Sequence, residues 1–320
     1  MSKGKRFLIN HLAWILLLLL CAVYYIFIGR LEEMPYMVMR QALPVGVMAA
    51  GMMFVLIVGN VDFSAGAQSF AACAIFTWCW NPSGLGLYDV TSLVISLGAV
   101  LVFGFLGALA VGHFRIPSFA SSLGIMYTVE GLALLLLGRN VVEMINGQQA
   151  FPFSLFWYSN LGVWVICLAV FMTAAFLILR FTRFGSLCRA VGTNPKAARL
   201  SGIPVFRIRC TAYMLCSVFA AISGMIQMGL NRGTSLMAGG LDTVIDVLAA
   251  CAAGGISFAG GKGKVSGLAG GVLLICTVNN MMTRIGVNVG SARLIKGLLL
   301  LVFAALDMHF RKKAGETLAE

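Results

Sequence analysis

Ten long apolar runs, each with few or no charged residues, constrain this chain more than any other feature. An α-helix rises 1.5 Å per residue, so about twenty apolar residues cross the roughly 30 Å hydrocarbon core of a bilayer. Of all residues, 60% are hydrophobic and 11% are charged, whereas soluble domains carry about a quarter charged residues. Charged side chains cannot cover so much apolar surface, and we therefore expect an all-α integral membrane protein.

The expected spans form one transmembrane domain over residues 1–320. A basic start followed by an apolar run resembles a signal peptide, but the run is long for one and no A-x-A site follows, so we interpret it as the first span. The ten spans are residues 10–29, 38–59, 66–80, 90–112, 118–138, 161–180, 210–230, 244–258, 265–283 and 292–309.

The distribution of basic residues gives the orientation. With the N-terminus in the cytoplasm, sixteen of the 23 Lys and Arg residues fall in predicted cytoplasmic segments and seven at the opposite ends. This bias agrees with the positive-inside rule. We expect a multi-pass protein of a bacterial inner membrane with both termini in the cytoplasm, and the net charge of +12 then needs no nucleic-acid partner.

Two of the spans, 66–80 and 244–258, are short, and each adjoins a glycine-bearing polar break. The breaks are "GNVDFSAG" at 59–66 and "GGISFAGGKGK" at 254–264. Short, interrupted spans in both halves of a chain are typical of transport sites. We therefore predict a substrate pathway or gate that includes Asn60, Asp62, Phe63, Ser64, Ser257 and Phe258.

Three further polar residues in or near spans are candidates for the same pathway. Glu130 falls in the middle of a span, where an ionisable residue is a functional hypothesis by default. Asn279 and Asn280 could bind a polyol in the pathway, or could bond a neighbouring helix. Asp62 could simply cap the next helix. A proton-coupled secondary transporter that uses Glu130 or Asp62 remains the alternative function.

Residues 231–246 suit an outward-facing gate or an ordinary loop, with a helical pattern only from about Leu241. The break at 254–264 does not match a nucleotide-binding P-loop, since Ile256 and Gly263 occupy the positions of the first Gly and of the Ser/Thr. No catalytic motif is present, and the nine cysteines lie almost all in apolar runs. We expect no enzyme activity, no bound metal and no cofactor.

A separately capped helix is expected in the polar segment 181–209. Asn194 suits the N-cap and Pro195 the first helical position. Gly202 suits a left-handed terminator, and Pro204 prevents continuation. A helix this short is not stable alone, and its basic face with Ala197 and Leu200 favours a cytoplasmic protein partner over lipid headgroups.

Several motifs resemble the permease subunits of bacterial ribose-type (monosaccharide) ABC importers. They are "AVGTNPKAARLSGI" at 190–203, "AISGMI" at 221–226, "GGISFAGGKGKVSGLAGGVLL" at 254–274, "NN" at 279–280 and "GNVDFSAGAQ" at 59–68. The resemblance covers about residues 40–310 and implies a type II-like ABC importer permease of about ten helices. Its coupling segment would be Asn194, Pro195, Lys196, Ala197, Ala198, Arg199, Leu200 and Gly202.

The resemblance also implies partners and cargo. A cytoplasmic ATPase subunit would bind ATP and Mg²⁺, a second permease subunit, identical or homologous, would complete the pathway, and a periplasmic binding protein would deliver the solute. Glu130, and "GNVD" in place of the family's "GGID", depart from the pattern. A monosaccharide is the expected cargo, with nucleosides, branched-chain amino acids and a furanosyl signalling molecule as alternatives.

Overall fold

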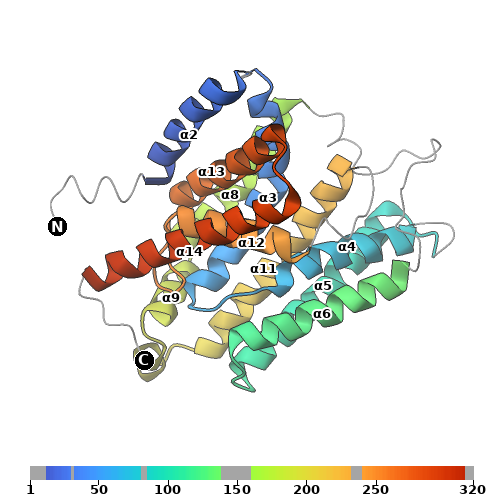
Figure 1. Cartoon of the computed structure of the whole chain (residues 1–320). Helices are drawn as coiled ribbons and strands as arrows, with labels where there is room; N and C mark the ends of the chain where they lie inside the picture. The colour runs from blue at the N-terminus through green and yellow to red at the C-terminus, as the bar shows by residue number, and fades with distance from the viewer. Residues whose placement is uncertain (1–11, 30–31, 81–84, 138–159, 232–239, 314–320) are drawn as a thin grey trace.

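The computed structural model describes residues 12–29, 32–80, 85–137, 160–231 and 240–313, and its regular elements there are all α-helices (Figure 1). The helices are α2 (Leu12–Ile28), α3 (Met34–Ile57), α4 (Ser64–Trp80), α5 (Asp89–Gly112), α6 (Ser118–Leu137), α8 (Leu161–Phe181), α9 (Arg183–Thr193), α10 (Pro195–Leu200), α11 (Val205–Asn231), α12 (Leu241–Ala253), α13 (Val265–Ile285) and α14 (Val289–Lys313).

Ten of these helices correspond to the ten expected spans. Seven are long and apolar enough to cross a membrane, namely α3, α5, α6, α8, α11, α13 and α14. The other three are shorter, with 17 residues in α2, 17 in α4 and 13 in α12. The chain is thus an all-helical, multi-pass membrane protein, and its two interrupted spans are short as expected.

The expected boundaries need two corrections. Helix α12 ends at Ala253, five residues before the expected end. It ends there because two glycines follow, Gly254 and Gly255, whose N–H groups donate hydrogen bonds to carbonyl oxygens of the last turn of α12. Helix α11 begins at Val205 rather than at residue 210, directly after Pro204. The basic residues before residue 12, Arg139, and residues 232–239 of the expected outer gate lie outside the described residues.

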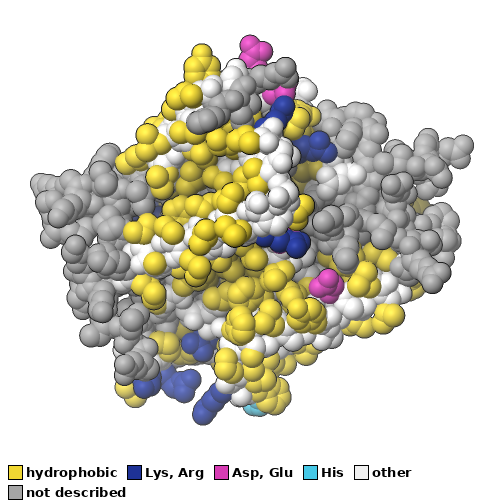
Figure 2. Space-filling model, viewed as in Figure 1, with side chains coloured by type: hydrophobic (Ala, Val, Ile, Leu, Met, Phe, Trp, Pro, Cys, Tyr) yellow, Lys and Arg dark blue, Asp and Glu magenta, His cyan; other side chains and the backbone are white. Residues whose placement is uncertain are grey.

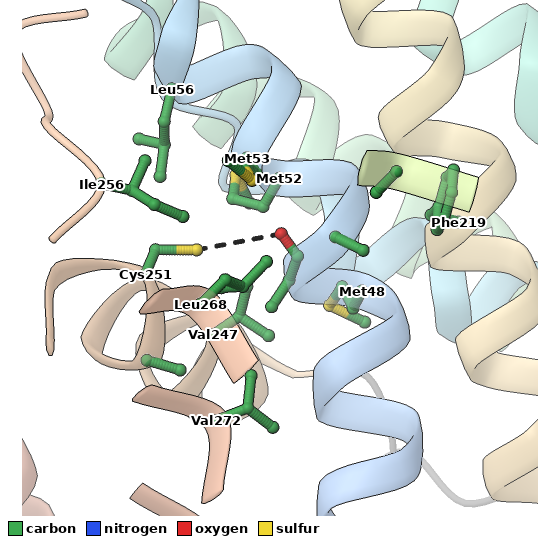
Figure 3. Packing of buried hydrophobic residues seen from close by; sticks show 14 of the residues in the cluster. Met48, Met52, Met53, Leu56, Phe219, Val247, Cys251, Ile256, Leu268 and Val272 are labelled. Atoms are coloured by element: carbon green, nitrogen blue, oxygen red, sulfur yellow. Dashed lines mark hydrogen bonds between the residues drawn. The ribbon is translucent and has the colours of Figure 1, made fainter. Parts of the chain in front are cut away.

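Helix α3 lies at the centre of the molecule (Figure 1). From Ala42 to Val58 only Val45 is partly exposed, and the helix contacts α8, α11, α12 and α13. Figure 3 shows Met48 and Met52 of α3 facing Val247 and Cys251 of α12. Unbranched methionine side chains fit the irregular spaces between such helices. The Cys251 thiol donates a weak hydrogen bond to the carbonyl oxygen of Ala49, 3.9 Å away.

The outer helices present large apolar side chains to the surroundings. Leu135 of α6, Ile166 of α8 and Leu301 of α14 are exposed, and Figure 2 shows apolar side chains across most of the described surface in this view. Soluble monomers rarely expose apolar area on this scale. Lipid, together with any partner subunit, therefore covers these faces.

The helices define two ends of the molecule. At one end of the molecule, the start of α3 lies with the last residues of α11 and α13, and we call it the cavity end, after the cavity described below. At the opposite end, the last residue of α3 lies with the starts of α11 and α13. We call this the α10 end, because it carries α10 and both polar breaks.

Candidate functional site

Helix α10 has the caps that its sequence predicts. The side-chain oxygen of Asn194 accepts a hydrogen bond from the Ala197 nitrogen at 3.0 Å, and Pro195 is the first helical residue. Gly202 has φ +77°, the left-handed conformation in which glycine ends helices. Its nitrogen donates to the Arg199 carbonyl at 3.1 Å, so both ends of this two-turn helix are satisfied locally.

One face of α10 packs on the protein and the other is free of it. Ala198 is buried against the core, whereas Lys196, Ala197 and Arg199 are exposed. Leu200 is 91% exposed. Figure 2 shows Lys and Arg side chains gathered at the lower end of the molecule, where Figure 1 places α9 and the start of α11. An exposed leucine at the end of a basic, capped helix is a feature to which a protein partner can bind.

The segment predicted as a loop, 181–209, is mostly helical. Its first residue ends α8, its last five begin α11, and between them lie α9 and α10. Helix α9 was not predicted. Thr182 caps it by accepting a hydrogen bond from the Gly185 nitrogen at 3.3 Å, and Cys188 and Val191 are buried. Burial raises the pKa of the Cys188 thiol to about 12.

The end of α9 meets both polar breaks. The nitrogen of Gly261 donates to the carbonyl oxygen of Ile57 at 2.8 Å, which joins the second break to the end of α3. Gly192 lies against the same carbonyl and against the Gly261 nitrogen, so closely that a Cβ at position 192 would overlap both. We call Ile57, Gly192 and Gly261 the glycine junction. Through this junction Gly192, two residues before Asn194, contacts Ile57, which lies two residues before the start of the first break at Gly59.

In the first break, Asp62 caps α4, as one of the two alternatives predicted. Its carboxylate oxygen Oδ1 accepts hydrogen bonds from the nitrogen, at 2.9 Å, and from the hydroxyl of Ser64. Gln68, one turn on, donates to the Ser64 hydroxyl at 2.7 Å. Phe63 packs edge-on against Phe119, with ring centroids 5.5 Å apart. The amide nitrogen of Asn60 and the second oxygen of Asp62 are buried without a hydrogen-bond partner among the described residues.

The second break folds into a tight turn. The nitrogen of Ser257 donates to the Lys262 carbonyl at 3.1 Å, and the nitrogen of Gly260 donates to the Ser257 carbonyl at 3.2 Å. Ser257 is buried and Phe258 is partly buried, and Figure 3 shows Ile256 packed beside Leu56 of α3. The two sets of predicted gate residues are thus brought to one end of the molecule.

Glu130 lies apart from this cluster. It is partly buried on α6, and no residue in the described ranges forms an ion pair with it. The interpretation of Glu130 as a proton carrier is therefore not supported by any ion-pair partner among the described residues.

The two adjacent asparagines have different surroundings. Asn280 is buried, and its side-chain oxygen accepts a hydrogen bond from the Tyr24 hydroxyl at 3.0 Å, so it joins α13 to α2. Asn279 donates to Asp246 of α12 at 3.0 Å. Lys296 of α14 donates to the same Asp246 oxygen at 2.8 Å. Asn279 therefore belongs to a polar cluster that joins three helices.

This cluster lines a cavity of about 490 Å³ at the cavity end. Of its polar residues, the sequence analysis named Asn279 as a pathway candidate, and the predicted gate or loop segment 231–246 contains Asn231, Thr243 and Asp246. The polar lining residues come from five helices, so no local pattern could have identified them as one site. The lining residues are Met37, Arg40, Gln41, Pro44, Val45, Gln227, Leu230, Asn231, Thr243, Asp246, Asn279, Met282, Thr283, Val287, Ala292 and Lys296.

The cavity end contains three ion pairs between basic residues and carboxylates. At the cavity end Arg284 pairs with Glu33 at 2.7 Å, Arg293 with Asp242 at 2.8 Å, and Lys296 with Asp246. At the α10 end, Lys196 and Arg199 form no ion pair with any described residue. The exposed charges of Lys196 and Arg199 are therefore left without a carboxylate partner among the described residues.

Comparisons with known proteins agree with this architecture. The family described as "Branched-chain amino acid transport system / permease component" matches residues 34–304. The ribose import permease protein of Bacillus subtilis (strain 168) is 30% identical over 281 residues, which cover 87% of this chain and 84% of that relative. None of the solved protein structures matches the chain.

Two other relatives are similar over comparable lengths. The galactose/methyl galactoside import permease protein of Haemophilus influenzae is 28% identical over 83% of this chain and 84% of its own length. The L-arabinose transport system permease protein of Escherichia coli (strain K12) is 29% identical over 85% of this chain and 81% of its own length. The chain therefore belongs to the family of branched-chain amino acid transport system permease components, and it is a membrane-embedded permease rather than an enzyme.

Proposed function

We propose that the chain is the permease subunit of an ATP-driven importer that takes a monosaccharide from an extracytoplasmic binding protein and releases it into the cytoplasm. The relatives above are named for ribose, galactose or methyl galactoside, and L-arabinose. Their cargoes are all small neutral polyols. A monosaccharide is accordingly the cargo that the comparisons support best, although the family description names branched-chain amino acids.

The observation that carries the proposal is the geometry of α10. A two-turn helix with both ends capped, one face buried and a 91% exposed leucine suits docking into another subunit. ATP and Mg²⁺ would be bound by that ATPase subunit, since this chain has no P-loop. The α10 end would face the cytoplasm, and a second permease subunit, a copy or a homologue, would complete the transporter.

The glycine junction supplies a physical route from α10 to the gate. Gly192 lies two residues before Asn194 in the sequence, and it contacts the carbonyl of Ile57 and the nitrogen of Gly261. A displacement of α10 by the ATPase would therefore act directly on both breaks. The gate would consist of Asn60, Asp62, Phe63 and Ser64 in one break and of Ser257 and Phe258 in the other.

Uptake by the reconstituted transporter tests the cargo. The chain would be placed in lipid vesicles with its ATPase subunit, its binding protein and internal ATP. Uptake of labelled ribose, galactose and arabinose would be compared with uptake of labelled leucine. We expect uptake of at least one of the sugars and none of leucine. Uptake of leucine alone would contradict the proposed cargo.

A further inference from the structure

The cavity end contains a partly open space of a size that suits a small solute. Its volume of about 490 Å³ falls within the roughly 300–1,000 Å³ that is typical of ligand sites. It lies between the start of α3, the end of α11, the starts of α12 and α14, and the end of α13. All of its described walls thus belong to a single permease subunit, at the end opposite α10.

The walls carry hydrogen-bonding groups that are mostly neutral. Amides and hydroxyls both donate and accept hydrogen bonds, as the hydroxyls of a polyol do. None of the described lining residues is aromatic, so they offer a sugar ring no surface on which to stack. The neutral polar lining residues are Gln41, Gln227, Asn231, Asn279, Thr243 and Thr283.

The charged groups of the cavity are held by protein partners. Lys296 and Asp246 form an ion pair at 2.8 Å, with exposed fractions of 20% and 12% for their side chains. The guanidinium of Arg40 donates to the carbonyl oxygen of Leu230 at 2.8 Å. An arrangement in which each charge has a partner favours a neutral ligand over an ion.

Three lining residues also hold oxygens whose hydrogen-bonding capacity is unused. Oε1 of Gln227, Oδ1 of Asp246 and Oδ1 of Asn279 are buried and accept no hydrogen bond from the described residues. A buried polar atom without a partner costs about 1–3 kcal/mol. The residues that carry these three oxygens all line the cavity. Three such acceptors around one space point to a ligand that brings hydroxyl donors.

We propose that this cavity is a low-affinity site for a neutral monosaccharide inside a single permease subunit, with Gln227, Asp246 and Asn279 as acceptors for its hydroxyls. The inference rests on the proposed function, because it assigns that cargo to one place in the pathway. The described walls offer hydrogen bonds without a stacking surface, which keeps the affinity low, so the sugar can leave toward the gate at the α10 end.

Cysteine protection tests the site directly. Thr243 lines the cavity from α12 and is partly exposed, so Thr243→Cys places a thiol in its wall. The full chain, reconstituted in vesicles with its ATPase subunit, would be treated with a small methanethiosulfonate reagent. Peptide mass spectrometry then distinguishes the new thiol from the native cysteines. Ribose, galactose or arabinose at about four times its dissociation constant should slow labelling about fivefold, whereas leucine should not.

Asn279 and Asn280, which are adjacent in the sequence, provide a test variant and its matched control. Asn279→Ala, or Gln227→Leu as a second variant, should abolish the protection by sugar in the Thr243→Cys background. Asn280→Ala should leave the protection in place, since Asn280 bonds Tyr24 and does not line the cavity. If Asn279→Ala fails to fold, Gln227→Leu and the otherwise native Thr243→Cys protein still decide the question.

The result that overturns the inference is a Thr243→Cys thiol that reacts equally fast with and without any of the three sugars, or that does not react at all. If the same vesicles still import sugar from the binding protein, the cavity assignment fails and the proposed function stands. If they import no sugar but import leucine, the proposed cargo itself has failed.

Discussion

The main-chain nitrogen of Gly261 donates a hydrogen bond to the carbonyl oxygen of Ile57 across a distance of 2.8 Å. This bond joins the turn after α12 to the last residue of the central helix α3. Gly192, from α9, lies against both partners. Three segments that are far apart in the sequence thus share one contact of main-chain atoms, next to the helix that we propose couples to the ATPase.

A methyl group at Gly192 should disturb this junction. In Gly192→Ala the new Cβ overlaps the Ile57 carbonyl and the Gly261 nitrogen, and main-chain atoms cannot avoid it by changing rotamer. We expect a loss of stability of about 1–3 kcal/mol, measured as a lower Tm, and transport at a small fraction of the native rate. The control is Gly124→Ala, because a Cβ at Gly124 in α6 meets no atom within 4 Å. Native transport and Tm in Gly192→Ala would show that the junction tolerates movement.

Removal of the Asn194 cap should weaken α10 specifically. Asn194→Ala leaves the Ala197 nitrogen without the acceptor that it now has at 3.0 Å, at a cost of about 1 kcal/mol. We expect reduced stimulation of the ATPase subunit by this permease, with membrane insertion unchanged. Asn194→Asp, which keeps a side-chain acceptor, should restore most of the stimulation. Equal defects in the Ala and Asp variants would argue that the cap is not the cause.

The exposed tip of α10 should determine affinity for the ATPase. Leu200 contributes nothing to the core at 91% exposure, so Leu200→Asp should leave Tm unchanged. Loss of an apolar anchor at an interface should weaken association at least tenfold, or by about 1.4 kcal/mol. Ala198→Trp provides the contrast, since Ala198 is buried and a larger side chain should dislodge α10 and also lower Tm. Association of Leu200→Asp at native affinity, measured with purified subunits, contradicts the docking assignment.

Cys188 should be unreactive in the folded protein at ordinary pH. Burial raises the pKa of its thiol from about 9 to about 12, and the thiolate is the reactive form. We expect no labelling by maleimide at neutral pH, whereas Ala190→Cys, exposed on the same helix, should react readily. Because the folded-state pKa is the higher one, the neutral thiol favours the folded state below about pH 9. This contribution should be lost as the pH rises from about 9 to about 12. Rapid labelling of Cys188 in the native protein would show that α9 opens.

Hydropathy was sufficient to place the ten helices that correspond to the expected spans, seven of which are long and apolar enough to cross a membrane, because lipid requires long apolar runs and these are visible in the sequence. It failed to place the end of α12, where the apolar character of Ile256 and Phe258 continues past the helix. Gly254 and Gly255 end the helix there, and Ile256 instead packs against the core. Helix α9 was missed because residues 183–193 are polar and basic enough to suggest a loop. Its helix depends on contacts of Cys188 and Val191 with the core.

The local parts of the site were predictable and the long-range parts were not. Asn194, Pro195 and Gly202 act on their own helix, so their spacing was enough to predict α10. The pair of Asp246 and Lys296 joins residues 50 positions apart, and Gln227 and Asn279 reach the same cavity from other helices. Such contacts depend on how the helices pack, which hydropathy and capping patterns do not specify. Glu130, prominent in the sequence, remains on α6 away from both ends of the proposed pathway.

The energy source of uptake tests the central claim most directly. Vesicles that contain the chain, its ATPase subunit and the sugar-loaded binding protein would be assayed with internal ATP, with a non-hydrolysable analogue, and with ATP plus a protonophore. We predict sugar uptake that requires hydrolysable ATP, persists when the proton gradient is collapsed and is lost in Leu200→Asp. Uptake that proceeds without ATP and stops with the protonophore would contradict the account and favour a proton-coupled transporter.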